Sequence, residues 1–147
     1  MDNFKFPLEK LLDIRKSNEE KSKRIFLEAS RQKKLVEDKI LNLQENYDQY
    51  KVIDQTKSVV ERKIANNYLL LMESCIDKAK EELIQHEKNV EKTRDELKAK
   101  QIERKTVEIL KQKKYDEFKK EQDRLEQIQN DEFALYSYIR AHGKEVK

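Results

Sequence analysis

Apolar residues recur along the first third of the chain at the spacing of an α-helix. Most are three, four or seven positions apart, as one face of a helix requires, and charged residues fill the gaps. The recurring positions are Leu8, Leu11, Leu12, Ile25, Ala29, Val36, Ile40, Leu43, Tyr47 and Tyr50. The pattern predicts a first helix over about residues 6–53. Pro7 falls in its first turn, where a missing N–H is no loss.

Written as heptads, this apolar stripe slips by one position between Ile25 and Ile40. We attribute the slip to the mismatch between a 3.6-residue helical turn and a 3.5-residue repeat. Polar residues occupy the middle of the seam, the line along which paired helices touch: Arg15, Asn18, Ser22 and Gln32. We therefore expect loose, polar pairing and modest stability.

The stripe loses its phase at residues 54–58, where Asp, Thr and Ser favour helix caps. Ser58 followed by Glu61 fits a capping box and predicts a second helix over about residues 59–139. Residues 140–147 are expected to form a tail. The second stripe alternates cleanly at first and less regularly later: Leu69, Met72, Ile76, Ala79, Leu83, His86, Val90, Thr93, Leu97, then Val107, Leu110, Phe118, Leu125, Ile128 and Leu135.

Two helices joined by a short connection must run antiparallel. A turn near residue 55 would place Tyr50 near Val60, Val36 near Ser74 or Cys75, and Leu8 near Ile102. The second helix would then be longer and overhang the start of the first. We therefore predict an all-α fold, in which two long helices form an antiparallel coiled-coil hairpin and residues 1–147 make a single rod.

The composition removes most alternatives to this fold. The chain holds one glycine and one proline. It therefore lacks the residues that tight turns between strands and Gly-rich phosphate loops require. Disorder is the remaining rival, because 43% of the residues are charged. The net charge is only +3, however, and balanced charge with regular apolar spacing is typical of exposed helix faces.

No arrangement of residues points to catalysis, a cofactor or a metal. His86 and His142 are the two histidines, and neither has the spacing of a zinc site. His86 falls on the seam and Cys75 close to it, so both are interpreted as packing residues. No apolar run could span a membrane, and the N-terminus lacks the features of a secretory signal. We expect a protein that is not an enzyme.

Aromatic residues gather near the two ends of the predicted hairpin, and a two-helix rod is too thin to bury all of them. Such residues dominate protein-binding hot spots, which favours a partner at one or both ends. Residues 98–120 hold nine bases and four acids. This segment is interpreted first as a solvated face, then as a site for an acidic protein, and last as a nucleic-acid or membrane-surface binder.

The chain resembles the FliJ family of bacterial flagellar export proteins. The resemblance begins with Phe4, Phe6, Leu8 and the run Leu11-Leu12-Asp13-Ile14-Arg15. It continues in Glu103-Arg104-Lys105, Ile109-Leu110-Lys111 and the run from Glu126 to Ala134. It covers nearly the whole chain, and the length and the position of the turn agree. The tail differs, because Tyr136-Ser137-Tyr138 stands where a more basic sequence is expected.

The resemblance implies a stalk-like antiparallel coiled coil with no enzyme activity and no cofactor, cytoplasmic and peripheral at the inner face of the membrane. Its partners would be the hexameric flagellar export ATPase and the large membrane subunit of the export gate, and some members are described as escorting export chaperones. No nucleic acid is implied. The residues that match the gate-binding region are at the hairpin end: Leu43, Tyr47, Tyr50, Met72, Ile76 and Ala79. Those that match the portion entering the ATPase ring are Phe4, Phe6, Leu8, Leu11, Arg15, Arg104, Lys105 and Lys111.

A second hypothesis is a generic scaffolding coiled coil that forms a homodimer. The two apolar stripes could zip two chains into a four-helix bundle. Sedimentation separates the two hypotheses, because a monomeric extended rod favours the stalk and a tight dimer favours the scaffold.

Overall fold

The computed structural model describes residues 3–53 and 58–143 and contains two helices, α1 (Glu9–Ile53) and α2 (Val59–Gly143). No strand occurs among these residues, and the all-α prediction is confirmed. Helix α1 begins at Glu9 and not near residue 6. Residues 140–143, expected in the tail, belong to α2. Residues 54–57 of the predicted turn and 144–147 of the predicted tail lie outside the described residues.

At the start of each helix, an oxygen of a preceding residue accepts a hydrogen bond from a backbone N–H group of the first turn. The amide of Glu9 donates to the carbonyl of Phe6 (3.2 Å), and that of Leu12 donates to the carbonyl of Leu8 (3.0 Å). Pro7 therefore lies in a turn just before α1 and not within its first turn. At α2, the Ser58 hydroxyl accepts the backbone N–H of Glu61 at 3.4 Å, which is the Ser58 half of the predicted capping box.

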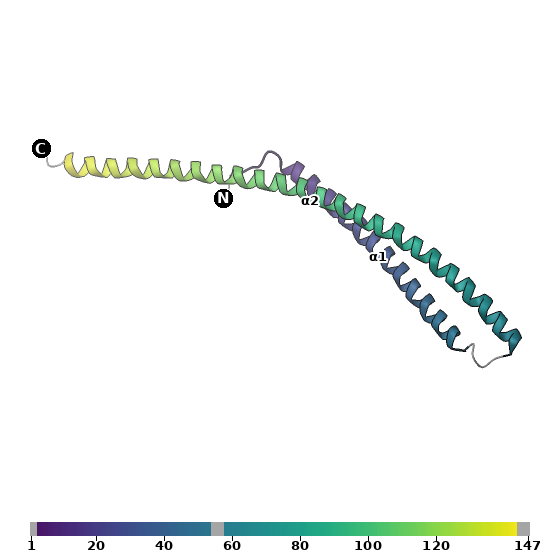
Figure 1. Ribbon diagram of the computed structural model, residues 1–147. Helices are drawn as coiled ribbons and strands as arrows, with labels where there is room; N and C mark the ends of the chain where they lie inside the picture. Colours follow the sequence, from purple (N-terminus) through teal and green to yellow (C-terminus); the bar gives the residue numbers. More distant parts are fainter. Residues whose placement is uncertain (1–2, 54–57, 144–147) are drawn as a thin grey trace. The chain divides into compact units, whose positions relative to one another are not determined.

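The chain divides into two compact units, of which the larger comprises Ser17–Ile102. Within it, α1 and α2 lie side by side and run in opposite directions (Figure 1). Its core is a cluster of Val36, Ile40 and Ala79, with Leu43 and Leu83 packed against it. The Arg94 guanidinium lies over the Phe26 ring, 5.7 Å from its centroid. The predicted antiparallel pairing is confirmed in this unit.

The predicted register of the pairing is wrong by about eight residues, or two helical turns. Val36 packs near Ala79 and Leu83 and not near Ser74 or Cys75. Tyr50 meets Tyr68 and not Val60. The cause is the apolar seam of α2: a turn centred near residue 55 would press Val36 against Ser74 and Cys75, which are both exposed. Apolar positions of both helices meet only in the shifted register.

The seam of α1 keeps a regular spacing, and the predicted slip at Ile25 is wrong. Phe26 is half-buried where Ile25 is exposed, so the three-and-four alternation continues without a break. The polar middle of the seam is confirmed, because Ser22 is buried and Arg15, Asn18 and Gln32 are half-buried. In α2, every predicted seam position from Leu69 to Leu97 is buried or half-buried.

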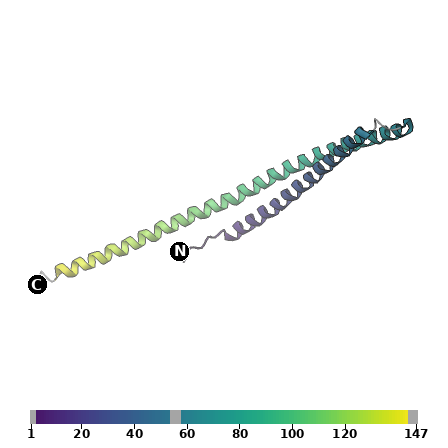
Figure 2. The ribbon, with the colours of Figure 1, turned by 90° about the horizontal axis from the view of Figure 1, so that it is seen from below.

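The smaller unit comprises Met1–Lys16 and Glu103–Lys147. Phe6, Leu12 and Val107 form its core, and Phe4 and Leu11 pack against them. The Phe4 ring lies 5.4 Å from that of Tyr115 and 5.5 Å from that of Phe118. From residue 119 to residue 143, every side chain is exposed. Figure 2 shows this last part of α2 continuing with no α1 beside it, as the predicted overhang requires.

Candidate functional site

The six residues predicted at the hairpin end do not form one exposed surface. Met72, Ile76 and Ala79 are 4%, 8% and 1% exposed, because they face α1 in the seam. The other three, Leu43, Tyr47 and Tyr50, lie on α1 and are half-buried or exposed. Half of this set therefore holds the hairpin together, and the tyrosines are its accessible part.

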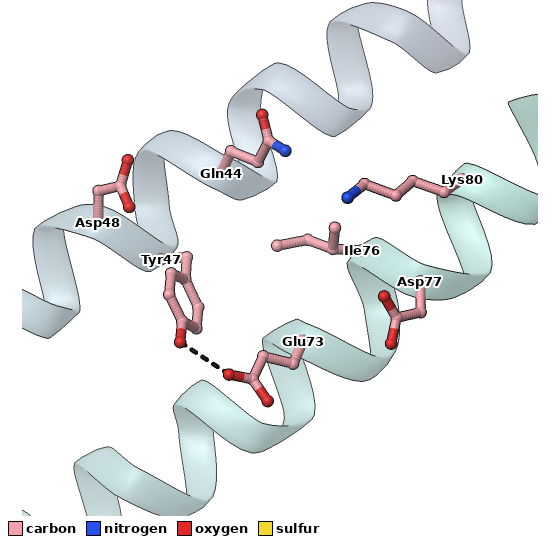
Figure 3. Close-up of a pocket in the computed structure, with 7 residues that line it drawn as sticks. All are labelled: Gln44, Tyr47, Asp48, Glu73, Ile76, Asp77 and Lys80. Carbon is pink, nitrogen blue, oxygen red and sulfur yellow. Dashed lines mark hydrogen bonds between the residues drawn. The ribbon is translucent and has the colours of Figure 1, made fainter.

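A shallow groove at the hairpin end is lined by Gln44, Tyr47, Asp48, Glu73, Ile76, Asp77 and Lys80. The Tyr47 hydroxyl points from α1 toward α2 and donates a hydrogen bond to Glu73 Oε1 at 2.7 Å (Figure 3). This bond to a carboxylate raises the pKa of Tyr47. Nearby, the Tyr50 and Tyr68 rings lie 4.6 Å apart. The groove is narrow and polar, which suits a protein side chain better than a small substrate.

The most exposed apolar residues at this end were missed by sequence reasoning. Val59 and Val60 are 79% and 69% exposed, and Ile64, Leu70 and Leu71 are each more than 60% exposed. Ile64, Leu70 and Leu71 belong to a stretch without charge, residues 64–72, in a chain that is otherwise dense in charge. It passed unnoticed because these residues lie off the seam spacing.

The termini end contains the eight residues predicted to meet the ATPase ring, and most of them hold the N-terminal segment on α2. Phe6 is buried, and Phe4 and Leu11 pack against its cluster. Ion pairs at this end include Arg15–Glu103 (2.8 Å), Lys111–Glu9 (2.9 Å) and Arg104–Glu108 (2.7 Å). Leu8 and Lys105 are the predicted residues that the structure leaves exposed. The first two pairs join α1 to α2, so part of the basic segment 98–120 is neutralised.

The overhanging part of α2 continues the seam spacing without a partner helix. Leu125, Ile128, Leu135 and Ile139 are exposed, and Phe118 at the start of the series is half-buried. Glu121 and Glu132 occupy the intervening seam positions. We call this series the overhang stripe. It includes four residues that the sequence analysis placed on the second stripe: Phe118, Leu125, Ile128 and Leu135.

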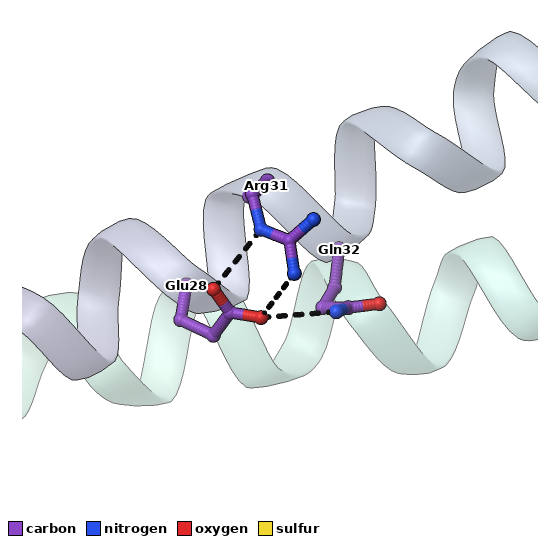
Figure 4. Close-up of polar contacts among 3 residues, drawn as sticks. All are labelled: Glu28, Arg31 and Gln32. Carbon is purple, nitrogen blue, oxygen red and sulfur yellow. Dashed lines mark hydrogen bonds and ion pairs between the residues drawn. The ribbon is translucent and has the colours of Figure 1, made fainter.

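A local clamp stands on the exposed side of α1. Glu28 accepts hydrogen bonds from both Arg31 Nε (3.0 Å) and Arg31 Nη2 (2.7 Å), and from Gln32 Nε2 at 3.0 Å (Figure 4). The guanidinium of Arg31, helped by Gln32, lowers the pKa of Glu28 to about 2. Because the pKa of Glu28 is lowered in the folded chain, its ionised carboxylate stabilises the folded chain at pH values above about 4.5. This contribution is lost as the pH falls from about 4.5 to about 2.

We expect Arg31→Ala to raise the pKa of Glu28 toward 4.5, because the bidentate donor is removed. The side-chain carboxyl resonance of Glu28, followed by NMR against pH, measures this directly. Lys34→Ala removes a positive charge from the same exposed helix without touching Glu28 and should leave the pKa near 2. Equal shifts in the two variants would show that general charge, and not the clamp, holds the carboxylate.

The side chains of the described residues that could bind a metal do not gather at one place. Among residues 3–53 and 58–143, no three His, Cys, Asp or Glu side chains stand close enough to share a metal ion. Cys75 is exposed, so its interpretation as a packing residue is wrong, although it directly precedes the buried seam residue Ile76. His86 is half-buried beside Glu82, with 3.9 Å between Nε2 and Oε1.

No helix in the described part of the chain is long and apolar enough to cross a membrane.

Comparison with known protein families gives a match over most of the chain. The family described as "Flagellar FliJ protein" matches residues 4–143, which is nearly the whole chain. The searches of curated proteins and of solved structures gave no match.

Proposed function

The chain belongs to the flagellar FliJ family, and on that premise we propose that it is a non-enzymatic, stalk-like rod of the flagellar protein export apparatus. Family membership gives the export apparatus as its place of action. The proposal adds two contacts, one between the termini end and the export ATPase hexamer, and one between the hairpin end and the membrane export gate.

The overhang stripe is the observation that supports a partner at the termini end. Four apolar side chains, Leu125, Ile128, Leu135 and Ile139, lie on one face of a helix and are open to water. Helices in water gain most of their stability from packing an apolar face against a neighbour. A stripe at seam spacing that continues past the last α1 contact therefore favours a bound partner.

Charge on the same stripe favours a different protein over a second copy. Glu121 and Glu132 lie among the apolar residues. In a parallel pair of identical overhangs each glutamate would face its own copy across the seam, and like charges at these positions are destabilising. This weighs against a homodimer in which the two overhangs pair in parallel.

The exposed tyrosines support the proposed gate contact at the hairpin end. Tyr50 and Tyr68 are both exposed, and their rings support each other at 4.6 Å. Rigid aromatic side chains with polar ends are frequent anchors in protein interfaces. Met72, Ile76 and Ala79, which the family resemblance also points to, would act here by holding α2 in register beneath these rings.

We expect the purified chain to raise the ATPase activity of its cognate export hexamer. A variant with Leu125→Gln, Ile128→Gln and Leu135→Gln should need about tenfold more protein for the same effect, since it loses the apolar contacts of the overhang stripe. Phe133→Gln is the matched control, because Phe133 is exposed on the same overhang but lies off the stripe. Steady-state phosphate release measures both.

No stimulation at saturating chain would contradict the ATPase contact, and equal loss in the Phe133 variant would contradict the role of the stripe. Sedimentation of the chain alone tests the scaffold hypothesis. A tight dimer that the triple substitution dissolves would favour the scaffold over the stalk.

A further inference from the structure

The first turns of α2 present an apolar face that no part of the described chain covers. We define the outward face by five exposed residues: Val59, Val60, Ile64, Leu70 and Leu71. They lie on the side of α2 away from the seam residues Leu69 and Met72, which are buried. The face is about 20 Å long and covers roughly 140° of the helix circumference. An exposed group of apolar side chains of this extent marks an interaction site.

The charges around the outward face are mainly basic. Lys51, Arg62 and Lys63 are exposed at this end of the unit. Glu61 is the single acidic residue between Ser58 and Met72. Acidic residues return only at Glu73 and beyond. The apolar face therefore coincides with a short region of net positive charge and ends where negative charge begins.

The width of the outward face distinguishes a partner helix from a membrane surface. A partner helix packs along a narrow seam of two positions per heptad, whereas this face is much wider and contains Lys63 within it. A second copy would bring the two Lys63 side chains toward each other. At a membrane surface, in contrast, apolar side chains enter the acyl boundary while lysines extend to the lipid phosphates.

We propose that the outward face of α2 docks directly on an anionic lipid bilayer, beyond the protein contacts of the proposed function. Val60, Ile64 and Leu71 enter the interface, and Lys63 meets the phosphate groups. Tyr50 and Tyr68 lie at the same end, where their rings suit the boundary between acyl chains and water. The acidic turns beyond Glu73 stay off the surface, so the contact is limited to the start of α2.

The test is flotation of the purified full-length chain with vesicles. Vesicles of phosphatidylglycerol and phosphatidylcholine should bind the chain, and vesicles of phosphatidylcholine alone should bind it much less. Lys63→Glu should weaken anionic binding by at least about fivefold. The triple variant Val60→Gln, Ile64→Gln and Leu71→Gln should lose binding at lipid concentrations that saturate the unchanged protein. Added salt should weaken binding throughout.

The matched control replaces three exposed apolar residues elsewhere, Leu27→Gln, Leu35→Gln and Ile109→Gln. It should bind as the unchanged chain does, with helical content checked by circular dichroism for each variant. Three results would overturn the proposal: no binding of the unchanged chain, binding kept by the outward-face variant, or equal loss in the control. A dimer in sedimentation that the outward-face variant converts to monomer would assign the face to a second copy instead. Because no gate protein or ATPase is present, failure here leaves the proposed function standing.

Discussion

Leu12→Ala should unfold the smaller unit more readily than any other single truncation there, at a cost of about 3 kcal/mol in the free energy of unfolding. Leu12 is 1% exposed and is the only fully buried large side chain among the described residues. It packs with Phe6 from the N-terminal segment and with Val107 from α2. Truncation leaves a cavity in a core too small to rearrange around it.

Urea denaturation followed by circular dichroism measures the loss, and hydrogen exchange locates it. Amides of residues 9–16 should exchange faster than those near Val36. Leu35→Ala is the control, because Leu35 is half exposed to water and its truncation should change stability by no more than about 0.5 kcal/mol. Similar losses in both variants would mean that residues 4–12 are not anchored to α2 as the structure has them.

The same core shows what the sequence could and could not reveal. Helix positions followed from apolar periodicity, and α1 ends at Ile53, the residue at which the pattern predicted its end. The packing of Phe4 against Tyr115 and Phe118 did not follow, because it joins residues more than a hundred positions apart. Periodicity shows which face of a helix is buried, but it carries no information on what that face meets.

The register error has a related cause. The prediction used the position of the turn to decide which residues of the two helices face each other. In the structure, the apolar seam sets this register. Buried apolar positions of α2 begin at Leu69, well after the helix itself begins at Val59, so its first turns extend past the seam. Those turns carry the outward face, and an analysis limited to seam positions could not find it.

The residues predicted to bind partners divide into an exposed and a buried set. Tyr50, Leu8 and Lys105 are exposed as a binding role requires, whereas Phe6, Met72, Ile76 and Ala79 are buried. An apolar residue at seam spacing gives the same sequence pattern whether it contacts the neighbouring helix or a partner protein. Burial decides between these roles, and it depends on the register.

Ala79→Asp tests this distinction and should be the most damaging substitution in the larger unit. Ala79 is 1% exposed and packs in one cluster with Val36 and Ile40. A carboxylate there would lose its hydration without gaining a partner, which costs about 3 kcal/mol or more. Thermal or urea unfolding of the purified chain should show the loss with no partner protein present.

Cys75→Asp is the matched control, one helical turn earlier on the same helix but exposed. It should change stability by no more than about 0.5 kcal/mol. If Ala79 were instead an exposed anchor for the gate, Ala79→Asp would leave the unfolding transition in place and weaken only gate binding. Unfolding of the isolated chain therefore separates a residue that holds the two helices in register from one that touches another protein.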